Sequence, residues 1–181
     1  MRWELLFADL EAFADATERA AFESDVADRG RAERAALALT DRLRGHLGAE
    51  LTFRLLGADT VRGRLADVGP DWVLLDDGGQ VVLPIAAVVG VDGVSRLAAT
   101  PPDELSRRAG LGVVLRRLSR DRVPVRVFLL DGTALTGTID RVGADHLDLA
   151  RHAADELRRV GAVRGVVVIR LGALAQIRAA G

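Results

Sequence analysis

The chain contains the same β-rich unit twice, and this internal repeat constrains its fold more than any other feature. Residues 51–75 align with residues 125–149 without a gap, at an offset of 74, and 7 of the 25 aligned pairs are identical. A second match, at an offset of 86, aligns residues 81–91 with residues 167–177. The second copy therefore carries 12 extra residues (86 − 74). We expect the two copies to form two similar structures in tandem.

Each copy predicts five antiparallel strands. In the first copy, apolar residues alternate at Leu51, Phe53 and Leu55, which is typical of a half-buried strand. The clearest hairpin turn is the Asp-Asp-Gly-Gly sequence at 76–79. Five short strands with open edges invite pairing with other chains, and closure removes those edges. We therefore expect each copy to close into a small β-barrel.

A helix is predicted before each barrel, and a further helix at the N-terminus. Apolar residues recur at helical spacing near the start of the chain and again before residue 48, and Thr100 precedes two prolines that favour a helix start. The predicted class is α+β, with an N-terminal helical segment and two helix-plus-five-strand barrels. The predicted domains are an amphipathic helix at 1–30, a helix and first barrel at 31–98, and a helix and second barrel at 99–181. The third carries a basic insertion at about 151–165.

The composition excludes several classes of site. The chain has no cysteine, so disulfides, zinc–thiolate centres and thiol catalysis are excluded. No apolar run reaches the roughly 18–20 residues that span a bilayer, and the N-terminus does not resemble a signal peptide, so we expect a cytoplasmic protein. All 25 basic residues are arginine, and lysine, asparagine and tyrosine are absent, which is typical of a GC-rich, actinobacterium-like genome.

The second copy resembles the Sm-like (LSm-type) barrel family. The resemblance rests on Leu130-Asp131-Gly132, Gly137-Thr138-Ile139, Asp145-His146-Leu147-Asp148-Leu149 and Val168-Ile169-Arg170-Leu171-Gly172. It implies a helix followed by five bent strands, and RNA binding through an asparagine and an Arg-Gly pair. Here Asp148 replaces the asparagine, and Leu171 separates Arg170 from Gly172. If the two copies stand in for adjacent subunits of an Sm-type ring, the fifth strand of one copy should pair with the fourth strand of the other.

The charge distribution supports nucleic-acid binding as one hypothesis. Residues 101–181 hold 14 arginines and 9 acids, although the whole chain has a net charge of −1. A basic face attracts phosphates. The candidate nucleic-acid-binding residues lie in the second copy and its insertion: His146, Asp148, Arg151, Arg158, Arg159, Arg164 and Arg170.

Protein assembly is the favoured hypothesis. Trp3, Phe7, Leu10 and Phe13 form an apolar stripe on the predicted N-terminal helix, and Trp72 is a candidate contact residue in the first copy. No sequence pattern indicates an enzyme, a cofactor or a metal site, since His146, Asp148 and His152 match no known ligand spacing. We therefore expect a non-catalytic adaptor or regulatory scaffold that binds a partner protein or itself, with a homodimer through the N-terminal helix as one form. An RNA- or DNA-binding regulator is the alternative.

Overall fold

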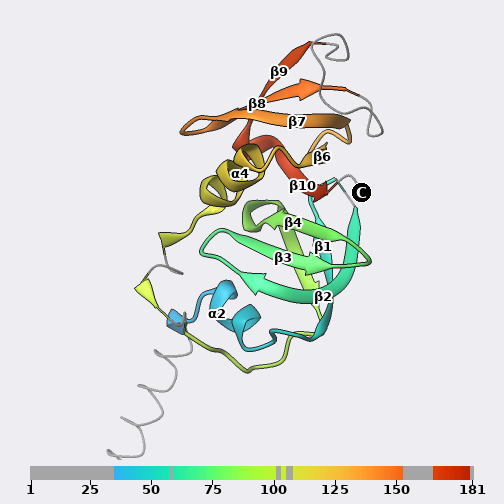
Figure 1. The fold of residues 1–181 in the computed structure, drawn as a ribbon. Helices are drawn as coiled ribbons and strands as arrows, with labels where there is room; N and C mark the ends of the chain where they lie inside the picture. Colours follow the sequence, from blue (N-terminus) through green and yellow to red (C-terminus); the bar gives the residue numbers. More distant parts are fainter. Residues whose placement is uncertain (1–34, 58, 101–102, 105–107, 153–164, 180–181) are drawn as a thin grey trace, which may run out of the picture. The chain divides into compact units, whose positions relative to one another are not determined.

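The fold is known from a computed structural model, which describes residues 35–57, 59–100, 103–104, 108–152 and 165–179 (Figure 1). The chain divides into two units, Met1–Ala38 and Leu39–Gly181, and both copies of the repeat lie in the second. The predicted helix at 1–30, with Trp3, Phe7, Leu10 and Phe13, lies outside the described residues. The same is true of most of the basic insertion, including Arg158, Arg159 and Arg164.

The first copy consists of a short helix followed by five strands. Its elements are α2 (Leu39–Arg44), β1 (Glu50–Leu55), β2 (Thr60–Val68), β3 (Trp72–Asp76), β4 (Gln80–Pro84), the single 3-10 turn η1 (Ile85–Ala87) and β5 (Val88–Asp92). The five strands and the hairpin turn at 76–79 agree with the sequence prediction. Gly78 adopts a φ of 91° in that turn, and its N–H donates to Asp76 Oδ1 over 3.2 Å.

The second copy repeats this order of elements. They are α4 (Leu111–Arg120), β6 (Pro124–Leu129), β7 (Ala134–Val142), β8 (His146–Arg151), β9 (Val166–Arg170), the 3-10 turn η2 (Leu171–Ala173) and β10 (Leu174–Ala179). Glu104 and Arg108 are helical, in agreement with the predicted helix start at Thr100, but residues 109–110 are not helical, so the predicted helix is interrupted before α4. Gly110, expected to weaken the middle of the predicted helix, is the N-cap residue of α4. In the part of the chain that the structure describes, no helix is both long and apolar enough to cross a membrane.

The ten strands form one antiparallel sheet, so the prediction of two closed Sm-like barrels in tandem is wrong. The strand order is β5-β1-β2-β3-β4-β10-β6-β7-β8-β9. Closure of the first copy would require β4 to pair with β5, but β4 pairs with β10 of the second copy instead. The sheet is therefore continuous across the two copies and open at β5 and β9 (Figure 1).

Both copies bend at the same repeat position, where only glycine fits. A Cβ atom on Gly63 would lie 2.9 Å from the carbonyl oxygen of Asp76, and one on Gly137 would overlap the carbonyl oxygen of Ala150. A β-bulge follows in β2, between Leu65 and Asp67, and a matching bulge interrupts β7. The bends let five strands enclose a core without closing the sheet.

Two apolar cores result, and they divide unequally between the copies. The first lies inside the first copy, with Phe53, Leu65 and Leu83 fully buried. The second lies inside the second copy but also includes Trp72 and Val82 from the first. The first copy thus supplies part of the second copy's core, which makes the boundary between the copies the most distinctive region of the described structure.

Candidate functional site: the joint between the copies and the two sheet edges

The two copies meet in a short β-ladder, called the joint below. Ile177 of β10 lies opposite Val82 of β4, and Arg178 lies opposite Val81. The fifth strand of the second copy therefore pairs with the fourth strand of the first, as expected if the copies behave as adjacent subunits. Val81, Val82 and Ile177 are 1%, 6% and 1% exposed, so the joint excludes water.

Helix α4 of the second copy, and the residues just before it, also bind the first copy. The indole N–H of Trp72 donates to the carbonyl oxygen of Ala109 over 2.7 Å, and the backbone N–H of Leu111 donates to Asp71 Oδ1 over 2.8 Å. Trp72 is 8% exposed and Leu111 is 6% exposed. Because the first N–H groups of a helix lack partners within it, Asp71 stabilises the start of α4 from the neighbouring copy. The sequence candidate Trp72 therefore lies in the joint.

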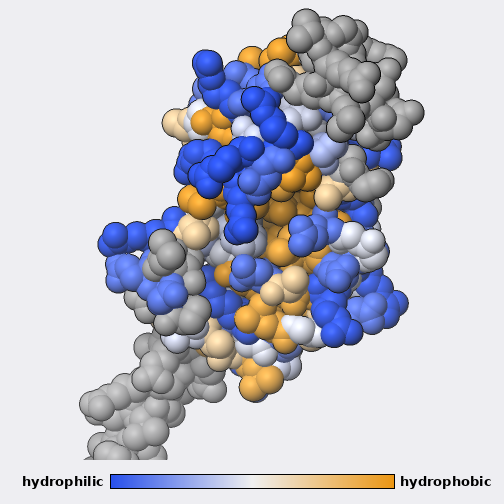
Figure 2. All heavy atoms as spheres, viewed as in Figure 1, coloured by the Kyte–Doolittle hydropathy of each residue, from blue (hydrophilic) through white to orange (hydrophobic). Residues whose placement is uncertain are grey.

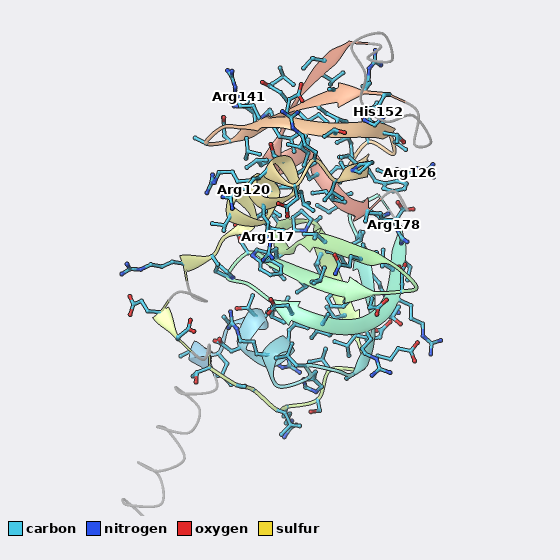
Figure 3. All side chains as sticks on the ribbon, viewed as in Figure 1. Arg117, Arg120, Arg126, Arg141, His152 and Arg178 are labelled. Carbon is cyan, nitrogen blue, oxygen red and sulfur yellow. The ribbon has the colours of Figure 1, made fainter. Side chains whose placement is uncertain are left out.

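An ion pair crosses the joint at its end. Arg178 Nη1 lies 2.7 Å from Asp77 Oδ2, and the two side chains are 34% and 18% exposed. Figure 3 shows Arg178 on β10, where that strand meets the first copy. Arg178 Nε also donates to Gln176 Oε1 over 3.0 Å, which holds the guanidinium in place. Contacts of this kind set the register of two strands more than they add to stability.

The free edges carry the counterparts of the strands in the joint. Under the repeat, β9 corresponds to β4 and β5 corresponds to β10. Val168, the counterpart of Val82, is 66% exposed, and Val89, the counterpart of Ala175, is 65% exposed, whereas Ala175 is 2% exposed. Hydrophobic atoms are visible in Figure 2 at the end of the molecule where Figure 1 places β9. Both edges therefore expose apolar side chains at positions that the joint buries.

The sequence candidates in the second copy fall into two places. His146 lies opposite Arg170 across the β8–β9 ladder, and Asp148 lies opposite Val168. His146 Nδ1 lies 2.9 Å from Asp145 Oδ1, and this hydrogen bond, with a smaller effect of the Arg170 charge, lowers the pKa of Asp145. Arg151 ends β8 at the opposite end of that strand. The structure thus brings His146 and Arg170 together but leaves Arg151 apart.

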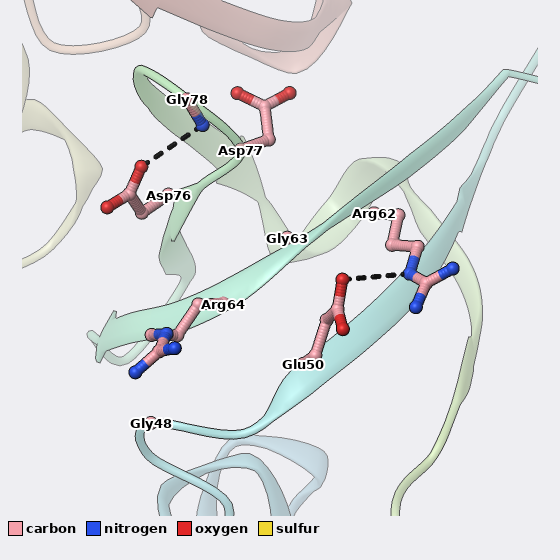
Figure 4. A pocket seen from close by; sticks show the side chains of 8 residues that line it. All are labelled: Gly48, Glu50, Arg62, Gly63, Arg64, Asp76, Asp77 and Gly78. Carbon is pink, nitrogen blue, oxygen red and sulfur yellow. Dashed lines mark hydrogen bonds and ion pairs between the residues drawn. The ribbon is translucent and has the colours of Figure 1, made fainter.

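Among the residues that the structure describes, the other polar groups form no further candidate site. The hollow in Figure 4 is lined by Glu50, Arg62, Arg64 and Asp76, with Glu50 and Arg62 paired at 3.0 Å, and it is open to solvent. No group of three or more possible metal ligands occurs among the described residues. His152 is buried, with its Nε2 atom 2.7 Å from the Thr138 hydroxyl, which is a structural contact within the second copy.

Sequence reasoning missed most of the residues that form the joint. Asp71, Asp77 and Arg178 were not candidates, and neither was Val168. The repeat alignment identifies equivalent positions in the two copies, but only the structure shows which of them are buried in one copy and exposed in the other. No protein-family model matches this sequence, and no curated protein matches it either. The functional conclusion therefore rests on the joint and on the two edges.

Proposed function

We propose that this chain is a non-catalytic, cytoplasmic assembly module that binds a β-strand of a protein partner along the free edges of its sheet. The observation that carries this proposal is the contrast between Val82 and Val168, which occupy the same repeat position and are 6% and 66% exposed. Edge strands offer unpaired N–H and C=O groups, and natural proteins usually protect them with charges, prolines or cover. Each free edge strand is apolar or glycine except for one charged residue at its end, and such an edge favours strand addition by a partner.

A strand peptide tests the proposal directly. The probe is a fluorescent peptide with the sequence of residues 86–94, which includes β5. It is titrated with the full-length chain carrying Val89→Lys, because this substitution stops β5 of the chain from competing with the peptide for β9. We expect a saturable rise in anisotropy, lost in the Val89→Lys/Val168→Lys double variant because a lysine on β9 would be buried by the added strand. A peptide of the same composition in scrambled order is the control. Absence of saturable binding, or equal binding to both variants, would overturn the proposal.

Nucleic-acid binding is the second candidate, and one surface favours it. Helix α4 exposes Arg116, Arg117 and Arg120, and Arg141 is exposed on β7, which packs against that helix. Figure 3 shows Arg120 and Arg141 on the same side of the second copy. Binding through these groups should weaken steeply with salt, because each neutralised phosphate releases counterions. A low 260/280 nm absorbance ratio after gentle purification, and no binding of a single-stranded oligonucleotide at low salt, would exclude this candidate.

The predicted homodimer through Trp3, Phe7, Leu10 and Phe13 remains a separate prediction, because those residues lie outside the described part of the chain. Deletion of residues 1–28 tests it by light scattering. Loss of association in the deleted chain would support the helix as the contact. Association that survives the deletion would assign it to the sheet edges.

A further inference from the structure

We infer that the partner of each free edge is a second copy of this chain, joined head to tail so that β9 of one chain pairs with β5 of the next. This inference rests on the proposed function and names its partner. The chain already contains one such joint, since β4 and β10 are the repeat counterparts of β9 and β5. The two free edges are thus the two complementary halves of a joint that the molecule is known to form.

The register of the inferred joint follows from the internal one. Ile177 lies opposite Val82, and their counterparts are Val91 and Val168. Val91 packs on the first copy's core and is partly buried, whereas Val168 is 66% exposed. In the internal joint Val82 completes the core of the copy that it contacts. Val168 would complete the first core of the next chain in the same way.

The ion pair that crosses the joint has a counterpart with its charges reversed. Arg178 corresponds to Asp92, and Asp77 corresponds to Arg151. The backbone confirms the second equivalence: the N–H of Asp77 donates to the carbonyl of Gly79 over 3.2 Å, and the N–H of Arg151 donates to the carbonyl of Gly165 over 2.9 Å. A joint between two chains would therefore place Asp92, which pairs with Arg54 at 2.7 Å in the single chain, beside Arg151.

This reversal specifies which copies can pair. A joint between two first copies would place Asp92 beside Asp77, and a joint between two second copies would place Arg178 beside Arg151. Both combinations bring like charges together, which is unfavourable, whereas a first copy against a second copy always brings opposite charges together. Because β4 and β10 are already paired with each other in each chain, only β5 and β9 are available, and the charges agree with the alternation of copies that this availability imposes.

The helices extend the correspondence. Helices α2 and α4 both begin Leu-x-x-x-Leu-Arg, and the second leucine, Leu43 or Leu115, is fully buried in each. Leu111 at the start of α4 is 6% exposed against the neighbouring copy, but Leu39 at the start of α2 is 39% exposed. Asp145, which occupies the repeat position of Asp71, would accept the N–H of Leu39 in the next chain. The strand pairing, the ion pair and the helix contact are thus all consistent with β5 of the next chain as the strand that pairs with β9.

Head-to-tail contacts of this kind are heterologous, so they produce a closed ring or a growing filament rather than a two-fold dimer. A complementation experiment separates these geometries. Val168→Lys blocks β9 and Val89→Lys blocks β5, and both substitutions replace exposed side chains. We expect each variant alone to have the single-chain mass of 19.3 kDa by light scattering, and an equimolar mixture to form a dimer of twice that mass that grows no further.

Other results would overturn the inference. A dimer of the Val89→Lys variant alone would indicate a symmetric β9–β9 contact, and a dimer of the Val168→Lys variant alone would indicate a β5–β5 contact. A mixture that stays at the single-chain mass at high concentration would show that the chains do not form this joint. If the peptide of residues 86–94 still bound β9 in that case, the proposed function would stand, and the result would mean that β5 does not dock on β9 when it is part of a whole chain.

The absence of cysteine from the chain allows a test of the register. We expect oxidation of a mixture of Val91→Cys and Val168→Cys chains to give a cross-linked dimer, because directly opposite residues of an antiparallel ladder lie within disulfide reach. A mixture of Val89→Cys and Val168→Cys chains, two residues out of register, is the control and should cross-link far less. Ile177→Cys with Val82→Cys in one chain should form the corresponding internal disulfide. Equal cross-linking in both mixtures would contradict the inferred register.

Discussion

The joint between β4 and β10 and the edge formed by β8 and β9 occupy the same repeat positions but carry different side chains. On the joint side, Trp72 and Leu74 of β3 flank Val82, and all three pack with the second copy's core. On the edge, His146 and Asp148 take the places of Trp72 and Leu74, and the valine at 168 remains. The two copies thus share the strand arrangement and the valine, but the second copy has polar residues where the first has Trp72 and Leu74.

Under the proposed function, this difference would make the joint permanent and the contact at the free edge reversible. A buried indole and a half-buried leucine contribute several kcal/mol that would be lost if the copies separated. His146 and Asp148 lie on β8, next to the edge strand, and both are partly exposed, so they offer less apolar surface to a partner. We therefore expect the joint to form during folding and the edges to associate in a concentration-dependent manner.

The largest effect should come from Trp72. Trp72→Ala removes a buried ring and its hydrogen bond to Ala109, and we expect a loss of about 4 kcal/mol in the free energy of unfolding. The matched control is His146→Ala at the equivalent position, which should change that free energy by no more than about 0.5 kcal/mol. Urea denaturation at low protein concentration measures both. Similar losses in the two variants would show that the joint and the edge are energetically equivalent.

Val82 should show the next largest effect. Val82→Asp buries a carboxylate in the joint, and we expect it to lower the free energy of unfolding by about 3 kcal/mol. Val168→Asp places the same carboxylate on the open edge and should cost at most about 0.5 kcal/mol in the single chain. The same denaturation experiment checks both values, and light scattering shows whether Val168→Asp also abolishes association. A costly Val168→Asp in the monomer would mean that β9 is already covered.

Asp71 should show a smaller effect. Asp71→Ala leaves the N–H of Leu111 without its carboxylate partner, and we expect a loss of about 1 kcal/mol, which is typical of a helix cap. Asp145→Ala should leave the stability of the single chain nearly unchanged, because the Asp145 side chain is 85% exposed and the contact with Leu171 uses the Asp145 backbone carbonyl, which the substitution keeps. Hydrogen exchange at the first turn of α4 should increase in the Asp71 variant alone. Equal protection in the Asp71 variant and the parent chain would contradict the proposed capping.

The sequence predicted the local elements of this fold well and their closure wrongly. Alternation such as Leu51, Phe53 and Leu55 requires only that one face of a strand is buried, and β1 and β2 show it clearly. Strand β4 is buried on both faces, and its position followed from the hairpin turn at 76–79 instead. Closure depends on which strand lies beside β4, and a strand has the same alternation whether its neighbour belongs to its own copy or to the next. The interruption of the predicted helix at 109–110 was missed because the carboxylate that accepts the Leu111 N–H, that of Asp71, comes from the other copy.

The candidate site shows the same limit. His146 and Arg170 were both candidates from the sequence, but their adjacency follows from the β8–β9 register, which the sequence analysis did not predict. The contact between Asp77 and Arg178 joins residues 101 positions apart, and it exists only because the sheet continues from one copy to the next. Burial contrasts such as that between Val82 and Val168 also need the three-dimensional structure, because both residues are valines in similar strands.

The ion pair of the joint should give the smallest effect and the sharpest comparison. A double-mutant cycle on Arg178→Ala and Asp77→Ala should yield a coupling of about 0.5 kcal/mol, because the side chains are 34% and 18% exposed and solvent screens the pair in part. Arg54 and Asp92 form an ion pair of the same 2.7 Å length on the open edge, but their side chains are 64% and 56% exposed. Their cycle should show no coupling above error in the single chain.

Raising the salt concentration should weaken the coupling in the joint only slightly, since a partly buried pair is less screened than an exposed one. Equal couplings in the two cycles would show that the joint gives its ion pair no protection from solvent, and would remove charge as a determinant of which copies pair.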